Sequence, residues 1–282
     1  MRKKINFIFL LLLGILLTSN NVLAQRGVVT EFATPLDPSA KPTPIYIGPA
    51  AGINIMGHNM NIKQLDLPDQ PLCPDFVDAK GLGFYAGLTM EYLIGDVATS
   101  TSAIIVRALY NTYPGTVTVE GDNLPIANGD SYINTVTEHS LDVKSSAVTL
   151  EAVYKFNPIP GMGFGLVAGP TFDYHLSKKW TQKFMLVSPN NVSFEPGANP
   201  NNYRYVDNNR TILIKDDVDI ENASSIRIGL KAGIQYEILL GSRFYIVPAV
   251  CYNFGITSFN SDYDWRISPL QVGLDARYAL TL

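Results

Sequence analysis

The sequence predicts an all-β protein, an eight-stranded antiparallel up-and-down barrel that crosses a membrane with its strands. Three observations support this fold class. The chain starts with an export signal, eight segments alternate apolar with small or polar residues, and the connections between these segments are alternately short and long. Alternation places every second side chain on the same face of a strand. Eight such segments, each with room for the about 9–11 residues of a tilted membrane strand, make a complete barrel.

Residues 1–24 have the features of a cleavable secretory signal peptide. Basic residues at positions 2–4 precede an apolar run over residues 5–17, and the segment ends with small residues up to Ala24. This order of basic, apolar and small residues is typical of export signals. The alternative is an uncleaved anchor, but the apolar run is shorter than the roughly 20 residues of a spanning helix. We therefore expect cleavage after Ala24.

The exported chain divides into a short lead-in and one domain. Four prolines between positions 35 and 44 predict an extended periplasmic lead-in over residues 25–43. Residues 44–282 then form the barrel. Without the three basic residues of the signal peptide, 18 basic residues stand against 25 acidic ones. Because this acidic chain has no basic patch, nucleic acid is not an expected partner.

The eight predicted strands share one pattern, with an apolar face and a small or polar face. In the first strand, Ile45, Ile47 and Ile53 lie on the apolar face, and the residues of the other face are small or polar. Val, Ile, Tyr and Phe, which favour strands, fill most apolar positions. The predicted strands cover residues 45–55, 82–92, 104–111, 148–156, 164–175, 226–238, 244–255 and 270–282.

The connections predict which end of the barrel faces outward. Short turns rich in Gly, Pro and Asp lie near residues 95–96, 157–161 and 241–242. Long connections lie near residues 57–80, 116–144 and 186–224, and a shorter one near 260–264. Short periplasmic turns and long outside loops are typical of outer-membrane barrels. Within the third long connection, residues 211–220 alternate like a further strand above the membrane.

Aromatic residues on the apolar face gather at the two ends of the predicted strands. Membrane interfaces favour such belts of amphipathic rings. The belt at the short-turn ends is a predicted aromatic girdle that consists of Tyr92, Tyr154, Phe156, Phe164, Tyr236, Phe244 and Tyr278. A second group, with Tyr110 and Tyr252 among its members, lies nearer the long connections.

The opposite face is expected to line the lumen. A soluble barrel with a polar exterior is the alternative, but this face is rich in glycine and has five acidic and five basic residues, which suits a crowded interior with paired charges. The predicted lumen network consists of Glu91, Arg107, Glu151, Lys155, Asp173, His175, Arg227, Lys231, Glu237, Asp275 and Arg277. Because eight strands leave an interior that side chains can fill, a wide pore is not expected. A narrow water- or ion-conducting path is an alternative.

Three features bear on chemistry. His175 lies two residues from Asp173, and we expect it to hydrogen-bond Asp173 or a neighbouring Tyr. No spacing indicates a nucleophile within reach of a base, so we predict that the chain is not an enzyme and has no catalytic residue, metal site or cofactor.

Residues 216–221 carry four acids that suit Ca²⁺, although a solvated acidic stretch is favoured. Cys73 and Cys251 are expected not to form a disulfide.

The strand layout and the last strand, with residues 271–278 reading QVGLDARY, resemble the small OmpA/OmpX-type outer-membrane barrels. More narrowly, the chain is similar to the PorT-like outer membrane protein β-barrel domain family, whose signal peptides often end in Ala-Gln as at residues 24–25. Ala276, Leu280 and Leu282 depart from the aromatic assembly signal that Tyr278 fits.

The resemblance implies location in the cell outer membrane, contact with outer-membrane lipid and insertion by the barrel-assembly machinery. It does not fix one activity. We expect a non-enzymatic barrel whose long extracellular loops serve binding, adhesion or envelope assembly. The alternatives are a PorT-like component of a protein secretion system, with a secretion-system partner, and a narrow solute or ion pore.

Overall fold

The structure is a computed structural model that describes residues 44–62, 75–95, 100–121, 123, 125–128, 131–159, 162–195, 204–240 and 243–280. The predicted signal peptide and lead-in, Cys73 and the turn at 241–242 lie outside the described residues. All regular secondary structure in these ranges is β-strand. The described part of the chain contains no apolar helix of membrane-spanning length.

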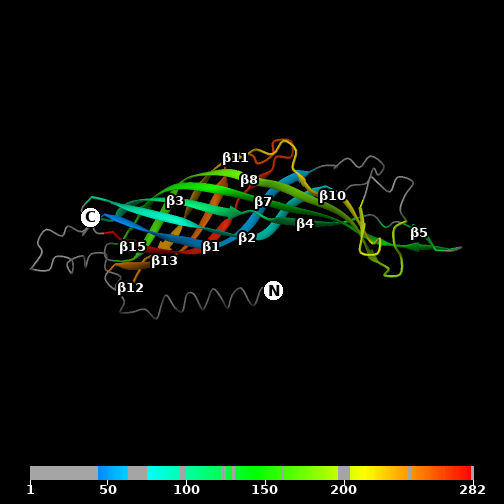
Figure 1. Cartoon of the computed structure of the whole chain (residues 1–282), viewed down its shortest axis with the longest axis horizontal. Coiled ribbons are helices and arrows are strands. Elements are labelled where there is room, and N and C mark those ends of the chain that lie inside the picture. The colour runs from blue at the N-terminus through cyan, green and yellow to red at the C-terminus, as the bar shows by residue number, and fades with distance from the viewer. Residues whose placement is uncertain are drawn as a thin grey trace, which may run out of the picture.

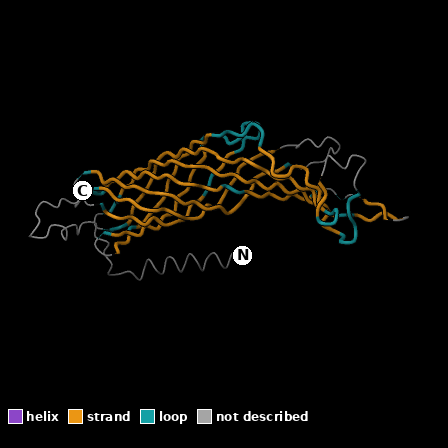
Figure 2. The backbone as a smooth tube through the Cα atoms, viewed as in Figure 1, coloured by secondary structure: helices purple, strands orange, loops and turns teal. Residues whose placement is uncertain are grey.

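The described strands close into an antiparallel barrel, which confirms the predicted fold class. Each barrel strand pairs with the next in chain order, and the last pairs with the first. Figure 1 shows the resulting cylinder and Figure 2 the oblique course of its strands. In these ranges the eight barrel strands are β1 (Ile45–Ile62), β2 (Phe76–Ile94), β3 (Ser102–Thr112), β7 (Val136–Phe156), β8 (Phe164–Ser188), β11 (Ile226–Tyr236), β13 (Phe244–Gly255) and β15 (Leu270–Ala279).

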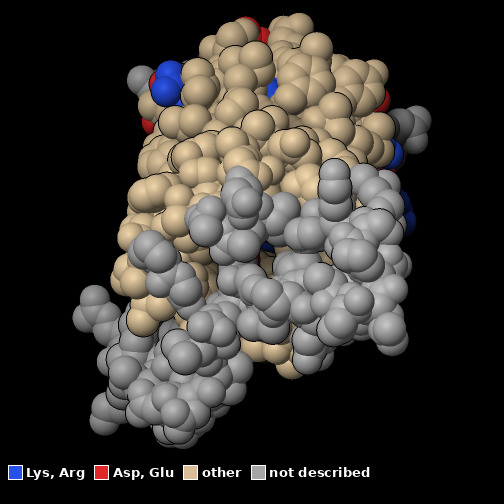
Figure 3. Space-filling view, turned by 90° about the vertical axis from the view of Figure 1, so that its left-hand side faces the viewer, with Lys and Arg blue, Asp and Glu red and all other residues tan. Residues whose placement is uncertain are grey.

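The barrel has an apolar outer surface and a polar interior. Along β2, Leu82, Phe84 and Leu88 face outward and are more than half exposed, while Tyr85 and Glu91 face inward and are buried. In Figure 3 most of the described surface in view is tan, and the charged groups lie mainly along its margin. A closed barrel satisfies its backbone hydrogen bonds without an edge, and an apolar exterior suits acyl chains. The barrel therefore lies in the outer membrane.

The seven residues of the predicted girdle lie on the outward face at the short-turn end. Phe164 pairs with Tyr236, and Phe244 pairs with Tyr278 on adjacent strands. Five of the seven are exposed, and Phe164 and Tyr236 are half-buried. Whether these rings contact lipid headgroups stays a prediction.

Two barrel strands are much longer than the sequence predicted, and the long connections beside them are partly strand. β7 starts at Val136 and β8 continues to Ser188. Three short strands join them beyond the barrel: β4 (Gly115–Glu120) pairs with β7, β10 (Thr211–Asp219) with β8, and β9 (Arg204–Val206) with β10. We call these three strands and the adjoining parts of β7 and β8 the outer sheet. It extends to the right of the barrel in Figure 1.

An irregularity marks the passage from the barrel to the outer sheet. Ala147 pairs with His175 and Ser146 with Ser177, so Leu176 is an extra residue on β8. Such a bulge bends a strand and increases its twist.

The structure confirms β10 at the predicted position. A separate hairpin is formed by β5 (Pro125–Asn128) and β6 (Ser131–Asn134). Two small strands complete the fold: β12 (Ile238–Leu240) pairs with β13, and β14 (Arg266–Ile267) with β1.

Candidate functional site in the lumen and the outer sheet

All eleven residues of the predicted lumen network are buried in the barrel interior. At the end with short turns, the ammonium group of Lys155 contacts the carboxylates of Glu91 and Glu237. Glu91 also accepts a hydrogen bond from Arg277 Nη1 at 2.5 Å. Lys155 on β7 thus reaches Glu91 on β2, although β3 lies between these strands. The contact crosses the lumen.

The chain of ion pairs continues through the middle of the barrel. Arg277 Nη2 donates to Asp275 Oδ2 at 2.6 Å, and the same oxygen accepts from Arg107 Nη2 at 2.8 Å. Arg107 lies 3.5 Å from Glu151, which also contacts the ammonium group of Lys231. Eight charged side chains therefore form one connected network of alternating sign.

Near the outer end, a separate ion pair joins β8 and β11. Arg227 Nε donates to Asp173 Oδ2 at 2.5 Å, and the two residues are direct cross-strand partners. Arg227 Nη1 also donates to the carbonyl of Ile267 at 2.6 Å, and its guanidinium lies over the ring of Tyr113. Asp173 accepts a further hydrogen bond from Thr149 Oγ1 at 2.6 Å. Both ions are thus held by several contacts.

Complete pairing makes a charged interior tolerable. A buried ion without a partner is strongly destabilising, whereas an ion with close partners and hydrogen bonds is retained. All five acids and all five bases of the network have an oppositely charged partner. The cavity beside Glu91, Glu237 and Arg277 measures about 10 Å³, enough for about one water. The lumen is filled.

An apolar cluster closes the outer end of the barrel. Phe259 and Trp265, from the segment between β13 and β15, are fully buried with ring centroids 5.0 Å apart. Trp265 Nε1 donates to Nδ1 of His58 at 3.1 Å, and the other ring nitrogen of His58 lies 3.1 Å from the carbonyl of Pro114. We call Phe259 and Trp265 the aromatic plug. The sequence did not indicate it, because polar residues surround both aromatic residues in the chain.

His175 does not have the hydrogen bond expected from the sequence. Its Nδ1 lies 2.9 Å from Ser145 Oγ, and its ring packs against Phe259 and Tyr113. Asp173 instead binds Arg227, because a carboxylate in a buried site prefers a cation. Ser145 was not a predicted site residue. Its spacing from His175 in the chain gives no signal, since the β7–β8 register brings them together.

Ion pairs cover one face of the outer sheet. Asp217 on β10 contacts Lys179 at 2.7 Å and Lys144 at 3.5 Å, and Asp142 contacts Lys183 at 2.7 Å. The hydrogen bond from Lys179 holds the pKa of Asp217 below its usual range. Asp216 contacts Arg204 at 2.8 Å. Two of the four acids considered for Ca²⁺, Asp216 and Asp217, are therefore paired with basic groups.

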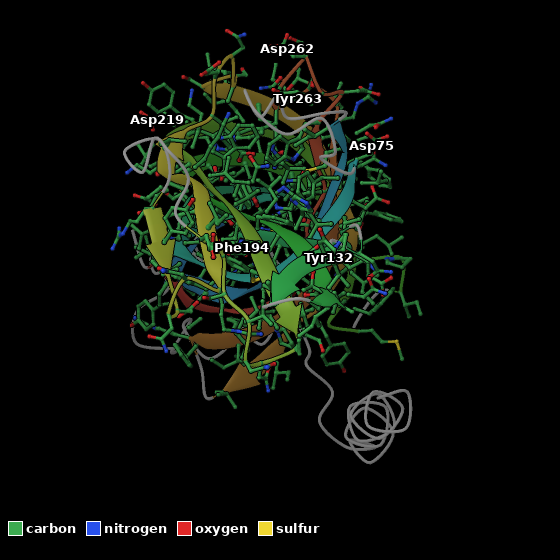
Figure 4. All side chains as sticks on the ribbon, turned by 90° about the vertical axis from the view of Figure 1, so that its right-hand side faces the viewer. Asp75, Tyr132, Phe194, Asp219, Asp262 and Tyr263 are labelled. Carbon is green, nitrogen blue, oxygen red and sulfur yellow. The ribbon has the colours of Figure 1, made fainter. Side chains whose placement is uncertain are left out.

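Aromatic rings lie on the other face of the outer sheet. His139 stacks on Phe184 with 4.4 Å between ring centroids, and Phe184 lies 5.1 Å from Phe194. Figure 4 views this end of the molecule and shows Phe194 near its centre, with Tyr132 and Asp219 farther out. In the described residues, Cys251 is a buried free thiol in the lumen.

A closed barrel with an apolar exterior and a filled, charged interior has the architecture of the small OmpA/OmpX-type outer-membrane proteins. No protein-family model and no curated protein matches the chain. Solved structures match it at low identity. Neisserial surface protein A (NspA) is 13% identical, with 85% of this chain and 99% of that chain covered and a TM-score of 0.33.

Two further matches have similar values. The outer membrane protein OprG from Pseudomonas aeruginosa is 11% identical, with 86% of this chain and 99% of that chain covered and a TM-score of 0.34. The outer membrane protease OmpT from Escherichia coli is 9% identical, with 86% and 98% covered and a TM-score of 0.33. At these values the matches assign no activity to this chain.

The prediction that the chain is not an enzyme is wrong, because a barrel of this architecture does not by itself exclude an enzyme. It is contradicted by the match to OmpT, which is a protease. No spacing in the chain indicated a hydroxyl within reach of a base, but the structure brings the hydroxyl of Ser145 to Nδ1 of His175. Both residues are buried beneath Phe259. A barrel of this kind therefore does not exclude catalysis.

Proposed function

We propose that the barrel is a rigid outer-membrane anchor that presents the outer sheet as a binding surface outside the cell. The observation that carries this proposal is the continuity of β7 and β8, which have 21 and 25 residues. A membrane crossing needs about 9–11 residues of a tilted strand. The remaining residues extend the sheet into the aqueous phase with uninterrupted strands, and sites on such elements are held more firmly than sites on loops.

The outer sheet and the β5–β6 hairpin, which connects β4 to β7, together have the composition of a surface for a protein or peptide partner. Tyr132 in the β5–β6 hairpin is 78% exposed, and Val136 and Val187 are also exposed at the far ends of β7 and β8. The outer sheet also carries the ion pairs of β8 and β10. Exposed aromatic and apolar groups with a polar rim are typical of protein-binding surfaces. Adhesion and envelope assembly are both uses of such a surface.

The filled lumen predicts that the purified protein does not act as a diffusion pore. In planar lipid bilayers at neutral pH we expect no large, stable conductance, because paired side chains and the aromatic plug occupy the interior. Single-channel recording checks this prediction. Large, long-lived current steps would contradict the anchor role and favour a pore. Removal of the plug side chains by Phe259→Ala with Trp265→Ala serves as a comparison in which leakage is expected to rise.

Site-specific photo-crosslinking on intact cells tests the binding role. A photoreactive amino acid at Tyr132 is expected to capture a discrete protein partner, because this side chain is the most exposed large apolar group of the described residues. The same amino acid at Leu88, which is 67% exposed on the lipid-facing wall, is the matched control. A crosslinked band at both positions, or at neither, would remove the support for the outer sheet as the binding surface.

Membership of the PorT-like family remains a proposal that rests on the resemblance. The same holds for insertion by the barrel-assembly machinery and for a secretion-system partner. A secretion component would bind a translocon through its periplasmic or outer side. Co-purification of the native protein with a translocon would support that role, and unchanged protein secretion in a deletion strain would remove it.

A further inference from the structure

A hollow of about 540 Å³ interrupts the outer wall of the barrel near its outer end. We call it the outer hollow. It lies across β2, β1, β14 and β13, and the residues that matter for its chemistry are Gly57, Asp78, Lys80, Phe254, Asp264 and Arg266. None of these belongs to the lumen network or to the outer sheet.

Small residues on adjacent strands create the outer hollow. Gly57 lies between the outward-facing Ile55 and Asn59 on β1, and it pairs with Lys80 on β2. On the other side, the backbone N–H of Ser268 donates to the Gly57 carbonyl at 2.8 Å. A side chain at position 57 would fill the space, since a Cβ there would lie 3.3 Å from the Ser268 carbonyl oxygen.

Charged groups of both signs surround the outer hollow. Asp78 and Lys80 contribute one of each from β2. Asp264 and Arg266 contribute the other two and form a loose pair at 3.7 Å with largely exposed side chains. Both acids have positive φ angles, 54° and 42°, a conformation that non-glycine residues rarely adopt and that often marks functional positions. The four charges sum to zero.

The outer hollow lies at the depth of the lipid headgroups. From Ile45 to Gly57, β1 rises roughly 30 Å along the barrel axis, at ~3.3 Å per residue and a tilt of ~40°. That equals the thickness of the hydrocarbon core. Tyr252 and Phe254, which also line the hollow, are outward-facing rings in edge-to-face contact with centroids 4.4 Å apart. Aromatic rings with one wet and one apolar side are typical of this depth.

We propose that the outer hollow binds the zwitterionic headgroup of a phosphoethanolamine lipid. Lys80 and Arg266 bind the phosphate, Asp78 and Asp264 bind the ammonium group, and the rings of Tyr252 and Phe254 pack against the start of the acyl chains. A purely anionic headgroup would meet two carboxylates, and a lone cation would meet two basic groups. A ligand with both charges offers an oppositely charged partner to each of the four groups.

Native mass spectrometry of the full-length protein in detergent micelles tests this site, with phosphatidylethanolamine and phosphatidylglycerol added separately. We expect the protein to retain phosphatidylethanolamine more strongly. Lys80→Ala, which removes a phosphate contact at an exposed position, should weaken retention about tenfold, near the lower end of the range for one hydrogen bond to a charged group. Gly57→Leu, which places a side chain in the hollow, should weaken retention by a similar factor.

Matched controls are available on other parts of the barrel. Ala168→Leu adds a similar bulk, three carbon atoms against four, to the lipid-facing wall on β8, and Lys144→Ala removes a lysine of the outer sheet. Both should retain lipid like the unaltered protein. The proposal is overturned if phosphatidylglycerol is retained as strongly as phosphatidylethanolamine, if neither lipid is retained, or if Gly57→Leu and Lys80→Ala behave like the controls.

Discussion

Replacing Arg227 with Met is expected to lower the free energy of unfolding by about 3–5 kcal/mol, because it leaves the carboxylate of Asp173 buried without its cation. Arg227 is fully buried, and its guanidinium also binds the Ile267 carbonyl and packs on Tyr113. Urea unfolding in lipid vesicles, followed by tryptophan fluorescence, measures the change. Trp180 and Trp265 both lie in the apolar cluster at the outer end and report on its loss.

Two further variants separate the buried charge from general damage. Lys144→Met removes an ion pair of the outer sheet, at 3.5 Å and largely exposed, and should leave the midpoint unchanged. Arg227→Met combined with Asp173→Leu replaces both ions by apolar groups and should recover much of the lost stability. If Arg227→Met unfolds at the same urea concentration as Lys144→Met, buried pairing does not stabilise this lumen.

Gly273→Val is expected to destabilise the barrel by about 3 kcal/mol, the upper end of ordinary overpacking. The interior has no room for a side chain at this position. A Cβ on Gly273 would lie 2.0 Å from the hydroxyl of Tyr85 and 2.5 Å from the backbone carbonyl of Ala51. The inward ring of Tyr85 occupies the space that Gly52 and Gly273 leave on adjacent strands. The folded fraction after refolding into vesicles measures the effect.

A rescue experiment with the smaller substitution Gly273→Ala identifies the clash. With Tyr85→Ala in the same chain, Gly273→Ala should fold better than Gly273→Ala alone, although the contact with the Ala51 carbonyl limits the recovery. Gly165→Ala is the matched control, because its nearest neighbours are flexible methylene groups of Lys155 and Gln235 at 3.3 and 3.4 Å. Equal losses for Gly165→Ala and Gly273→Ala would show that inward glycines are needed for another reason.

The sequence predicted the barrel because membrane strands repeat one strong physical pattern. Ile45, Ile47 and Ile53 face lipid and the residues between them face the lumen, so hydrophobicity alone places each side chain. The same alternation predicted which charged residues are buried, including Glu91 and Lys155, because each residue of a strand lies on one of two faces and the apolar face was assigned to lipid. Eight segments of this kind were enough to predict closure.

The partners of those charges could not be predicted, because they depend on register and on contacts across the lumen. Arg107 reaches Asp275, which is far away in the chain, and His175 meets Ser145 through the β7–β8 pairing. Apart from β10, the outer sheet was not predicted, for a different reason. Beyond the membrane its strands carry lysines and aspartates on one face, as near Lys144, and this composition resembles a loop.

Closure of the barrel imposes an order on its folding. Asn54 and Gln271, joined by a side-chain hydrogen bond between β1 and β15, are separated by 217 residues. The first strand therefore has one unsatisfied edge until the last strand reaches the membrane, and contacts of such long range form slowly. Over that interval the free edges can pair with other chains. The unpaired strand edges consequently need protection from other chains between export and the final pairing. Truncation of β15 would leave an open sheet that aggregates, and not a smaller barrel.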